Sequence, residues 1–72
     1  MNEATIDTIE WRGVTYEIDW PFDPNDPTTR DLHLVTIFRE EDHQVGEAWS
    51  PTRLRSEFEA LELACNYIRE EF

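Results

Sequence analysis

The sequence predicts an α+β fold in which an antiparallel sheet of three to four strands packs against one C-terminal helix. In the last stretch, apolar residues from Leu54 to Phe72 recur at steps of three and four, the spacing of one helix face. Alternating, β-rich runs separated by turn residues precede it, as expected for paired strands. A length of 72 residues allows a single domain, residues 1–72, near the lower size limit for a self-sufficient core.

The first two strands are expected at about residues 5–11 and 14–20, joined as a hairpin. Arg12 and Gly13 form the two-residue turn between them, a weaker hairpin signal than Asn-Gly. The register that this turn imposes places four apolar side chains on one face: Ile9, Trp11, Val14 and Tyr16. Asp7 does not fit this alternation, so a bulge or the end of pairing is expected there.

Residues 21–31 contain three prolines among Asp and Asn, which predicts a turn-rich loop that joins no central strand. Strands follow at about 32–39 and 45–49. The 32–39 strand is apolar on both faces, which is typical of a central strand. The sequence leaves open which face of this strand points into the core. The expected core includes Leu34 and Phe38, which share one face.

The helix is expected at about residues 56–71, where Ser56 and Glu59 form a capping box. Its core stripe is expected to comprise Phe58, Leu61, Cys65, Ile68 and Phe72, with Leu54 just before it. The complete expected core is Ile9, Trp11, Tyr16, Ile18, Leu34, Phe38, Phe58, Leu61, Cys65 and Ile68.

The charge is the strongest functional signal. Seventeen acids face six arginines without any lysine, giving a net charge of −11. Direct contact with nucleic acid or an anionic membrane is disfavoured, since both need clustered cations. A basic protein partner is favoured, because opposite fields speed encounter. The competing interpretation is that the charge only keeps the protein soluble.

The acids concentrate in the first part of the chain, on the predicted sheet and its loops. Regularly spaced carboxylates on a sheet face could imitate the phosphates of a nucleic acid and occupy a basic groove. The competing interpretation, which the residues favour slightly, is a solvated outer face. The acids expected to bind a partner are Glu10, Glu17, Asp19, Asp23, Asp26, Glu40, Glu41 and Asp42.

A second candidate surface is the back of the helix. Ala60, Leu63, Ala64 and Tyr67 are expected to lie away from the core stripe. An exposed Leu63–Tyr67 pair would suit contact with a partner or with a second copy of the chain. Two tryptophans, Trp20 and Trp49, are expected to fill the core, with interface anchoring as the alternative.

No motif predicts catalysis, a cofactor or a metal. Asp23-x-Asn25 begins like a calcium loop, but Pro27, Thr28 and Leu34 occupy positions where that loop needs an acid or amide, Gly and Glu. One cysteine and two distant histidines do not have zinc spacing, and Cys65 is expected to be a buried small hydrophobe. We therefore expect a non-enzymatic protein without cofactors. The lack of paired cysteines, of a signal peptide and of a membrane span favours a cytoplasmic location.

The function predicted from these features is an acidic interaction module, most sharply an inhibitor that occupies a nucleic-acid-binding surface of a basic protein. In size, acidity and lack of motifs, the chain is similar in kind to the small inhibitors that phages and mobile elements use against CRISPR or restriction systems. The alternative is an adaptor or small subunit of a larger complex, docked through the helix back and the aromatic residues.

Overall fold

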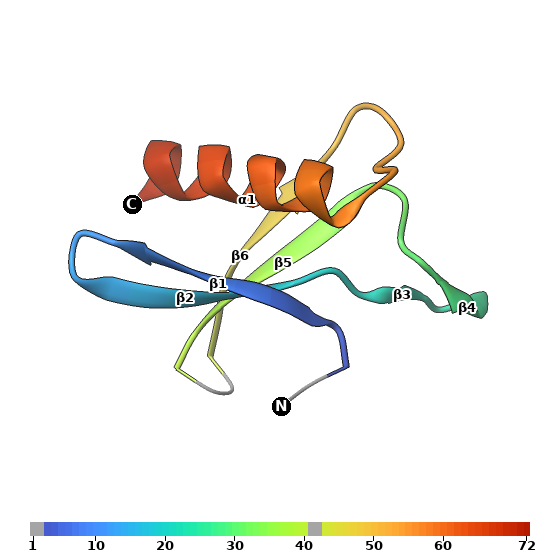
Figure 1. The fold of residues 1–72 in the computed structure, drawn as a ribbon, viewed down its shortest axis with the longest axis horizontal. Helices are drawn as coiled ribbons and strands as arrows, with labels where there is room; N and C mark the ends of the chain where they lie inside the picture. Colours follow the sequence, from blue (N-terminus) through green and yellow to red (C-terminus); the bar gives the residue numbers. More distant parts are fainter. Residues whose placement is uncertain (1–2, 41–42) are drawn as a thin grey trace.

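The computed structural model describes residues 3–40 and 43–72. It confirms the α+β prediction: one helix crosses one face of a four-stranded antiparallel sheet with strand order β1-β2-β5-β6, and a small sheet of β3 and β4 projects from one end (Figure 1). The elements are β1 (Thr5–Trp11), β2 (Val14–Asp19), β3 (Phe22–Asp23), β4 (Asp26–Arg30), β5 (Leu34–Arg39), β6 (His43–Trp49) and α1 (Glu57–Glu71).

The β1–β2 hairpin has the predicted register. Trp11 pairs with Val14 across the turn, and the register shifts between Thr5 and Asp7, where the bulge was expected. Arg12 and Gly13 have φ angles of 53° and 80°. Two successive positive φ angles are the signature of the type I′ turn, whose twist matches that of the strands it joins. The two-residue turn and the alternation of side chains therefore account for the observed register.

The proline-rich segment is more ordered than the predicted loop, because β3 and β4 pair with each other there. This ribbon is separate from the main sheet, so both of its strands are edge strands and tolerate proline at positions whose N–H is not needed. The carboxylate of Asp23 accepts a hydrogen bond from the backbone N–H of Asn25, at 2.8 Å. Asp26 accepts one from the backbone N–H of Thr28, at 3.1 Å. Asx turns thus shape the ribbon.

The prediction for the core face of β5 is wrong. Val35 and Ile37 are fully buried beneath α1, whereas Leu34 and Phe38 lie half-buried on the opposite face. Because β5 is apolar on both faces, its own alternation cannot choose between them. The choice comes from pairing: Ile37 lies opposite Ile18 of β2, which faces the helix.

The predicted helix start is confirmed, and the predicted core stripe of the helix is confirmed in part. Ile68 is buried and Leu61 and Phe72 pack against the core, but the placement of Phe58 in the core is wrong. Ser56 is the N-cap, and its Oγ accepts a hydrogen bond from the backbone N–H of Glu59 at 3.2 Å. The buried helix residues are Ala60, Ala64 and Ile68, while Phe58 is 73 % exposed. The two alanines allow the helix backbone to approach the sheet closely, which rotates the larger side chains toward the flanks.

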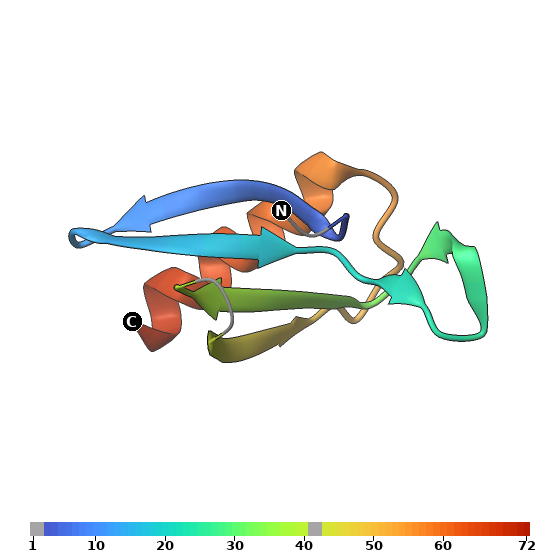
Figure 2. The ribbon, with the colours of Figure 1, turned by 90° about the horizontal axis from the view of Figure 1, so that it is seen from below.

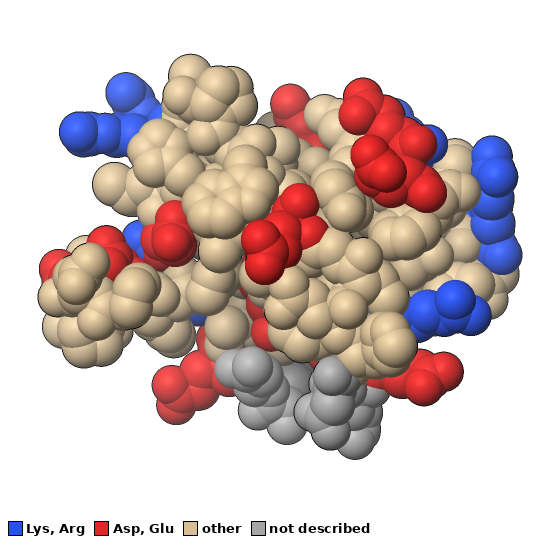
Figure 3. Space-filling model, turned by 180° about the vertical axis from the view of Figure 1, so that it is seen from behind, with Lys and Arg blue, Asp and Glu red and all other residues tan. Residues whose placement is uncertain are grey.

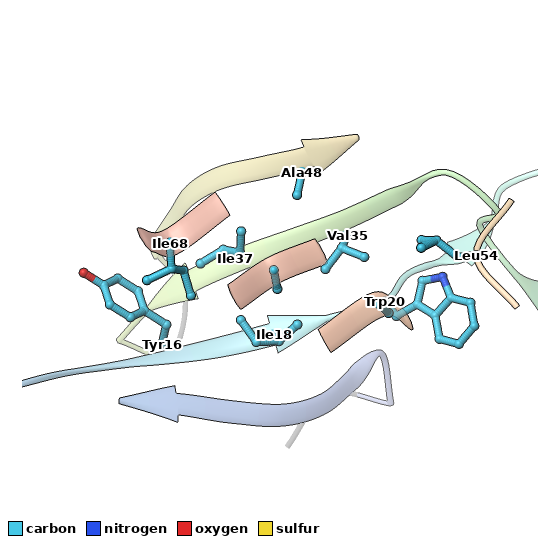
Figure 4. Close-up of a cluster of buried hydrophobic side chains, with 10 residues drawn as sticks. Tyr16, Ile18, Trp20, Val35, Ile37, Ala48, Leu54 and Ile68 are labelled. Carbon is cyan, nitrogen blue, oxygen red and sulfur yellow. The ribbon is translucent and has the colours of Figure 1, made fainter. Parts of the chain in front are cut away.

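The core fills the layer between α1 and the sheet (Figure 4). Its buried members are Tyr16, Ile18, Trp20, Val35, Ile37, Ala48, Leu54, Ala60, Ala64 and Ile68. Of the other expected core residues, Ile9, Trp11 and Leu61 pack at its margin, and Cys65 is only partly buried. The helix lies behind the sheet when the molecule is viewed from the sheet side (Figure 2). The described part of the chain places no helix over the other face of the sheet.

Candidate partner-binding surface

The sheet face turned away from α1 is the main candidate site, and we refer to it as the open face. Strand pairing and alternation place eleven residues on it: Thr8, Glu10, Thr15, Glu17, Asp19, Leu34, Thr36, Phe38, Gln44, Glu47 and Trp49. The register aligns Glu17, Phe38 and Gln44 in one row across β2, β5 and β6. Every charged side chain among these eleven residues is acidic.

Two of the predicted partner-binding acids present their carboxylates on the open face. Glu10 is exposed and Glu17 is half-buried. Alternation along the β1–β2 hairpin predicted this placement correctly, because side chains two residues apart along a strand point to the same face of the sheet. Whether they contact a partner stays a prediction.

Asp19 lies on the same face but is not a free surface charge. Only 4 % of the residue is exposed, and its Oδ1 accepts a hydrogen bond of 2.9 Å from the hydroxyl of Thr5. The expectation of a solvent-facing carboxylate at this position is therefore wrong. The β1–β2 pairing places Thr5 opposite Asp19, and it turns this acid into a structural group.

The remaining predicted acids lie elsewhere. Asp23 and Asp26 belong to the β3–β4 ribbon at one end of the molecule (Figure 1). Hydrogen bonds from the side chain and backbone of Thr28 lower the pKa of Asp26 below its ordinary value. Glu40 directly follows the C-terminal end of β5, where it is exposed and has a φ of 61°. The predictions for Glu41 and Asp42 concern residues outside those that the structure describes.

The fold thus divides the described acids rather than gathering them into one field. Seen from behind, acidic side chains lie in separate groups with uncharged surface between them, and arginines appear toward both ends (Figure 3). A partner that requires one continuous acidic array would not find it on that side. The open face offers a smaller, mixed acidic and aromatic surface.

The second predicted surface, the back of the helix, is not formed as expected. Ala60 and Ala64 are fully buried, and Leu63 and Tyr67 pack against the core. The Tyr67 ring lies above Gly46 of β6 and meets Phe72 edge-on, with ring centroids 6.0 Å apart. The prediction that these side chains point away from the core is wrong, because α1 packs on the sheet through Ala60, Ala64 and Ile68 and not through the face that contains Phe58. Partner contact by Leu63 or Tyr67 stays a prediction.

Sequence reasoning did not select Glu47, and it expected Phe38 and Trp49 in the core, with interface anchoring as the alternative for Trp49. The core expectation is wrong for both, because Phe38 is half-buried on the open face and Trp49 is largely exposed there. Trp49 is 62 % exposed, and its Nε1–H donates to the Glu47 carboxylate at 3.3 Å. Trp20, by contrast, is buried as expected. Alternation along β6 puts Glu47 and Trp49 on one face, so this pair could have been found once the core face of β5 was known.

Other kinds of site find little support in residues 3–40 and 43–72. These residues contain no group of three or more metal-ligating side chains that could hold an ion. Within the same residues, no helix is both long and apolar enough to cross a membrane. Comparisons with family models, curated proteins and solved structures found no match to this chain.

Proposed function

We propose that this protein is a non-enzymatic, cytoplasmic binding module whose open face docks onto a basic surface of another protein. In its specific form, it is an inhibitor that competes with nucleic acid for that surface. The supporting observation is that all charged side chains of the open face are acidic, in a chain whose net charge is −11. Such a field speeds encounter with a basic partner and slows approach to nucleic acid or anionic lipid.

The sheet fixes the spacing of the backbone positions that carry these charges. By strand geometry, the Cα atoms of Glu10 and Glu17 are about 8 Å apart, and those of Glu17 and Glu47 about 12 Å. The rigid sheet fixes where these side chains leave the backbone, whereas the flexible glutamate chains can adjust to arginines or lysines on a partner. This regular spacing supports a specific contact beyond a general effect of charge.

The aromatic side chains would add contact area to this electrostatic attraction. Trp49 is 62 % exposed, and Phe38 is half-buried between Glu17 and Gln44 in the same row. Tryptophan is over-represented among the residues that dominate binding energy at interfaces. An acidic surface with an exposed tryptophan is consequently suited to a protein partner.

Charge reversal on the open face tests this proposal. Wild-type protein is immobilised and used to capture partners from source-cell lysate, alongside Glu10→Lys/Glu17→Lys. A second double variant, Glu62→Lys/Glu70→Lys, makes the same change in net charge at exposed helix positions and is the matched control. We expect wild type and the control to capture a basic, nucleic-acid-binding protein that added DNA or high salt releases. The open-face variant should capture none of it, with an unchanged circular dichroism spectrum.

Two results would contradict the proposal. If both double variants lost the partner equally, net charge alone would account for capture. If the open-face variant captured the same partner as wild type, the open face would not be the binding surface.

A second candidate function, an adaptor that docks through apolar side chains, is favoured by one observation. Phe58 is 73 % exposed on the first turn of α1, and Leu61 and Cys65 beside it are only partly buried. A partner retained at high salt and released by Phe58→Ser would identify this function. Leu63 is less suitable for such a test, because it packs against the core.

A further inference from the structure

A hollow at one end of the sheet combines arginines with an apolar floor, and we refer to it as the arginine hollow. It is open to solvent, with a volume of about 570 Å³. Its principal lining residues are Trp20, Arg30, Leu32, Arg53, Leu54 and Arg55. Half of the six arginines in the chain converge here, and none of the residues that line the hollow is acidic. In a protein with a net charge of −11, this is a local concentration of positive charge, with the Glu59 carboxylate at its rim, where it accepts a hydrogen bond of 2.6 Å from the backbone N–H of Arg55.

The floor of the hollow is fixed by the fold. Trp20 and Leu54 lie side by side at the end of the core (Figure 4), with exposed fractions of 7 % and 5 %. The Trp20 Nε1–H donates to the carbonyl oxygen of Asp31 at 2.6 Å. The backbone N–H of Leu54 donates to the carbonyl of Leu32 at 2.7 Å, and Leu32 itself is 42 % exposed. An apolar side chain entering the hollow would therefore meet a preformed apolar surface.

The three arginines differ in how firmly they are held. The Arg30 guanidinium donates to the carbonyl of Trp20 at 2.8 Å and lies over the Phe22 ring, 4.2 Å from its centroid. Arg53 and Arg55 are exposed. Within the described part of the chain, no carboxylate pairs with the guanidinium of either. Both can turn toward an anion without breaking an existing ion pair.

We propose that the arginine hollow binds a short acidic peptide segment of a partner protein, in which an apolar side chain is flanked by carboxylates. The apolar side chain would rest on Trp20, Leu32 and Leu54, and the carboxylates would accept paired hydrogen bonds from Arg53 and Arg55. Arginine presents parallel donors that match a carboxylate. This site is distinct from the open face, opposite to it in sign, and does not depend on the function proposed above.

The surrounding charge favours a short peptide over a nucleic acid strand. Beyond the hollow the chain is acidic, so a long polyanion would extend into repulsive surface. Charges farther away than about 8 Å are largely screened at physiological salt. A segment with two carboxylates close to the arginines avoids most of that repulsion, while its apolar side chain supplies contact that screening does not weaken.

Titration with three peptides capped at both ends tests the inference. The probe peptide is Gly-Glu-Phe-Glu-Gly, the second replaces both Glu by Gln, and the third replaces Phe by Ala. The readout is the shift of the Trp20 indole N–H signal in nitrogen–proton correlation spectra. We expect the probe to bind at least roughly tenfold more tightly than either of the other two, because the Gln peptide loses both charged contacts with the arginines and the Ala peptide loses the buried ring.

Arginine variants locate the binding. Arg53→Gln/Arg55→Gln changes two exposed side chains, so the fold should be retained, and it should weaken binding of the probe peptide at least roughly tenfold. Arg39→Gln/Arg69→Gln removes the same charge at exposed positions outside the hollow and should leave the affinity within about twofold of wild type.

Three outcomes would overturn the proposal: equal affinity for the Glu and Gln peptides, equal weakening by the two double variants, or tighter binding of an oligothymidylate than of the probe peptide at the same indole signal.

Discussion

Replacing Gly46 by alanine tests whether α1 is rotated as described. Gly46 lies in β6 beneath the Tyr67 ring, and a Cβ at this position would lie 2.5 Å from both the Cε1 and the hydroxyl oxygen of Tyr67. Heavy atoms do not approach so closely without a bond. Gly46 does not have a positive φ angle. The backbone therefore accepts alanine, and the only obstacle is the ring above it.

The expected cost follows from two opposing terms. In a strand without an obstacle, alanine is more stable than glycine by about 0.5–1 kcal/mol. Forcing an extra methyl into a packed site costs about 1–3 kcal/mol. The Tyr67 ring is partly exposed and can swing outward, which limits the cost to the packing that the ring loses. We expect Gly46→Ala to lower the free energy of unfolding by about 1–2 kcal/mol, or the Tm by roughly 4–16 °C.

The assay is urea unfolding followed by circular dichroism, applied to a double-mutant cycle. Tyr67→Leu removes the ring atoms that the new methyl would contact. On that background, Gly46→Ala should be neutral or stabilising, because only the favourable strand term remains. If Gly46→Ala stabilised the wild-type protein, or destabilised both backgrounds equally, the Tyr67 ring would not pack over Gly46 and the described rotation of the helix would be refuted.

Three further predictions test the core, the helix surface and the ribbon. Ile37→Ala should reduce the free energy of unfolding by about 2–5 kcal/mol, and Phe38→Ala by only about 1 kcal/mol. Urea unfolding measures both, and a larger loss for Phe38→Ala would show that the core face of β5 is misassigned. Phe58→Ser should change stability by no more than about 0.5 kcal/mol, since the side chain is largely exposed; a loss typical of a core residue would contradict that exposure. Thr28→Val should raise the pKa of Asp26 toward its ordinary value in a carboxyl NMR titration, and an unchanged pKa would count against the hydrogen bond.

The sign of the Asp26 effect on stability follows from the direction of its shift. Its pKa is lowered in the folded protein, chiefly by the hydrogen bond from the Thr28 side chain. The contribution to stability is therefore present above the pKa of the unfolded chain and is lost as the pH falls through the lowered value. Because the group is fully exposed, this effect concerns the β3–β4 ribbon more than the whole fold.

Sequence by itself determined the features that depend on near neighbours in the chain. The β1–β2 register, its bulge near Asp7 and the Ser56 cap all follow from turn chemistry or alternation within about ten residues. The placement of Glu10 and Glu17 on one face follows in the same way. Such features can be predicted locally, because turn geometry and the alternation of side chains along a strand favour a single arrangement for each of them.

Only the tertiary structure decided which apolar faces became the core and which charged groups came together. Strand β5 is apolar on both sides, and α1 has apolar residues around most of its surface, so each could pack in more than one orientation. Pairing of Ile37 with Ile18 selected the core face of β5, and the close approach at Ala60 and Ala64 selected that of α1. That selection left Phe58 exposed. The burial of Asp19 and the convergence of distant arginines around Trp20 likewise depend on long-range packing. Sequence alternation and spacing describe one helix or strand at a time, whereas these features depend on packing contacts between different elements.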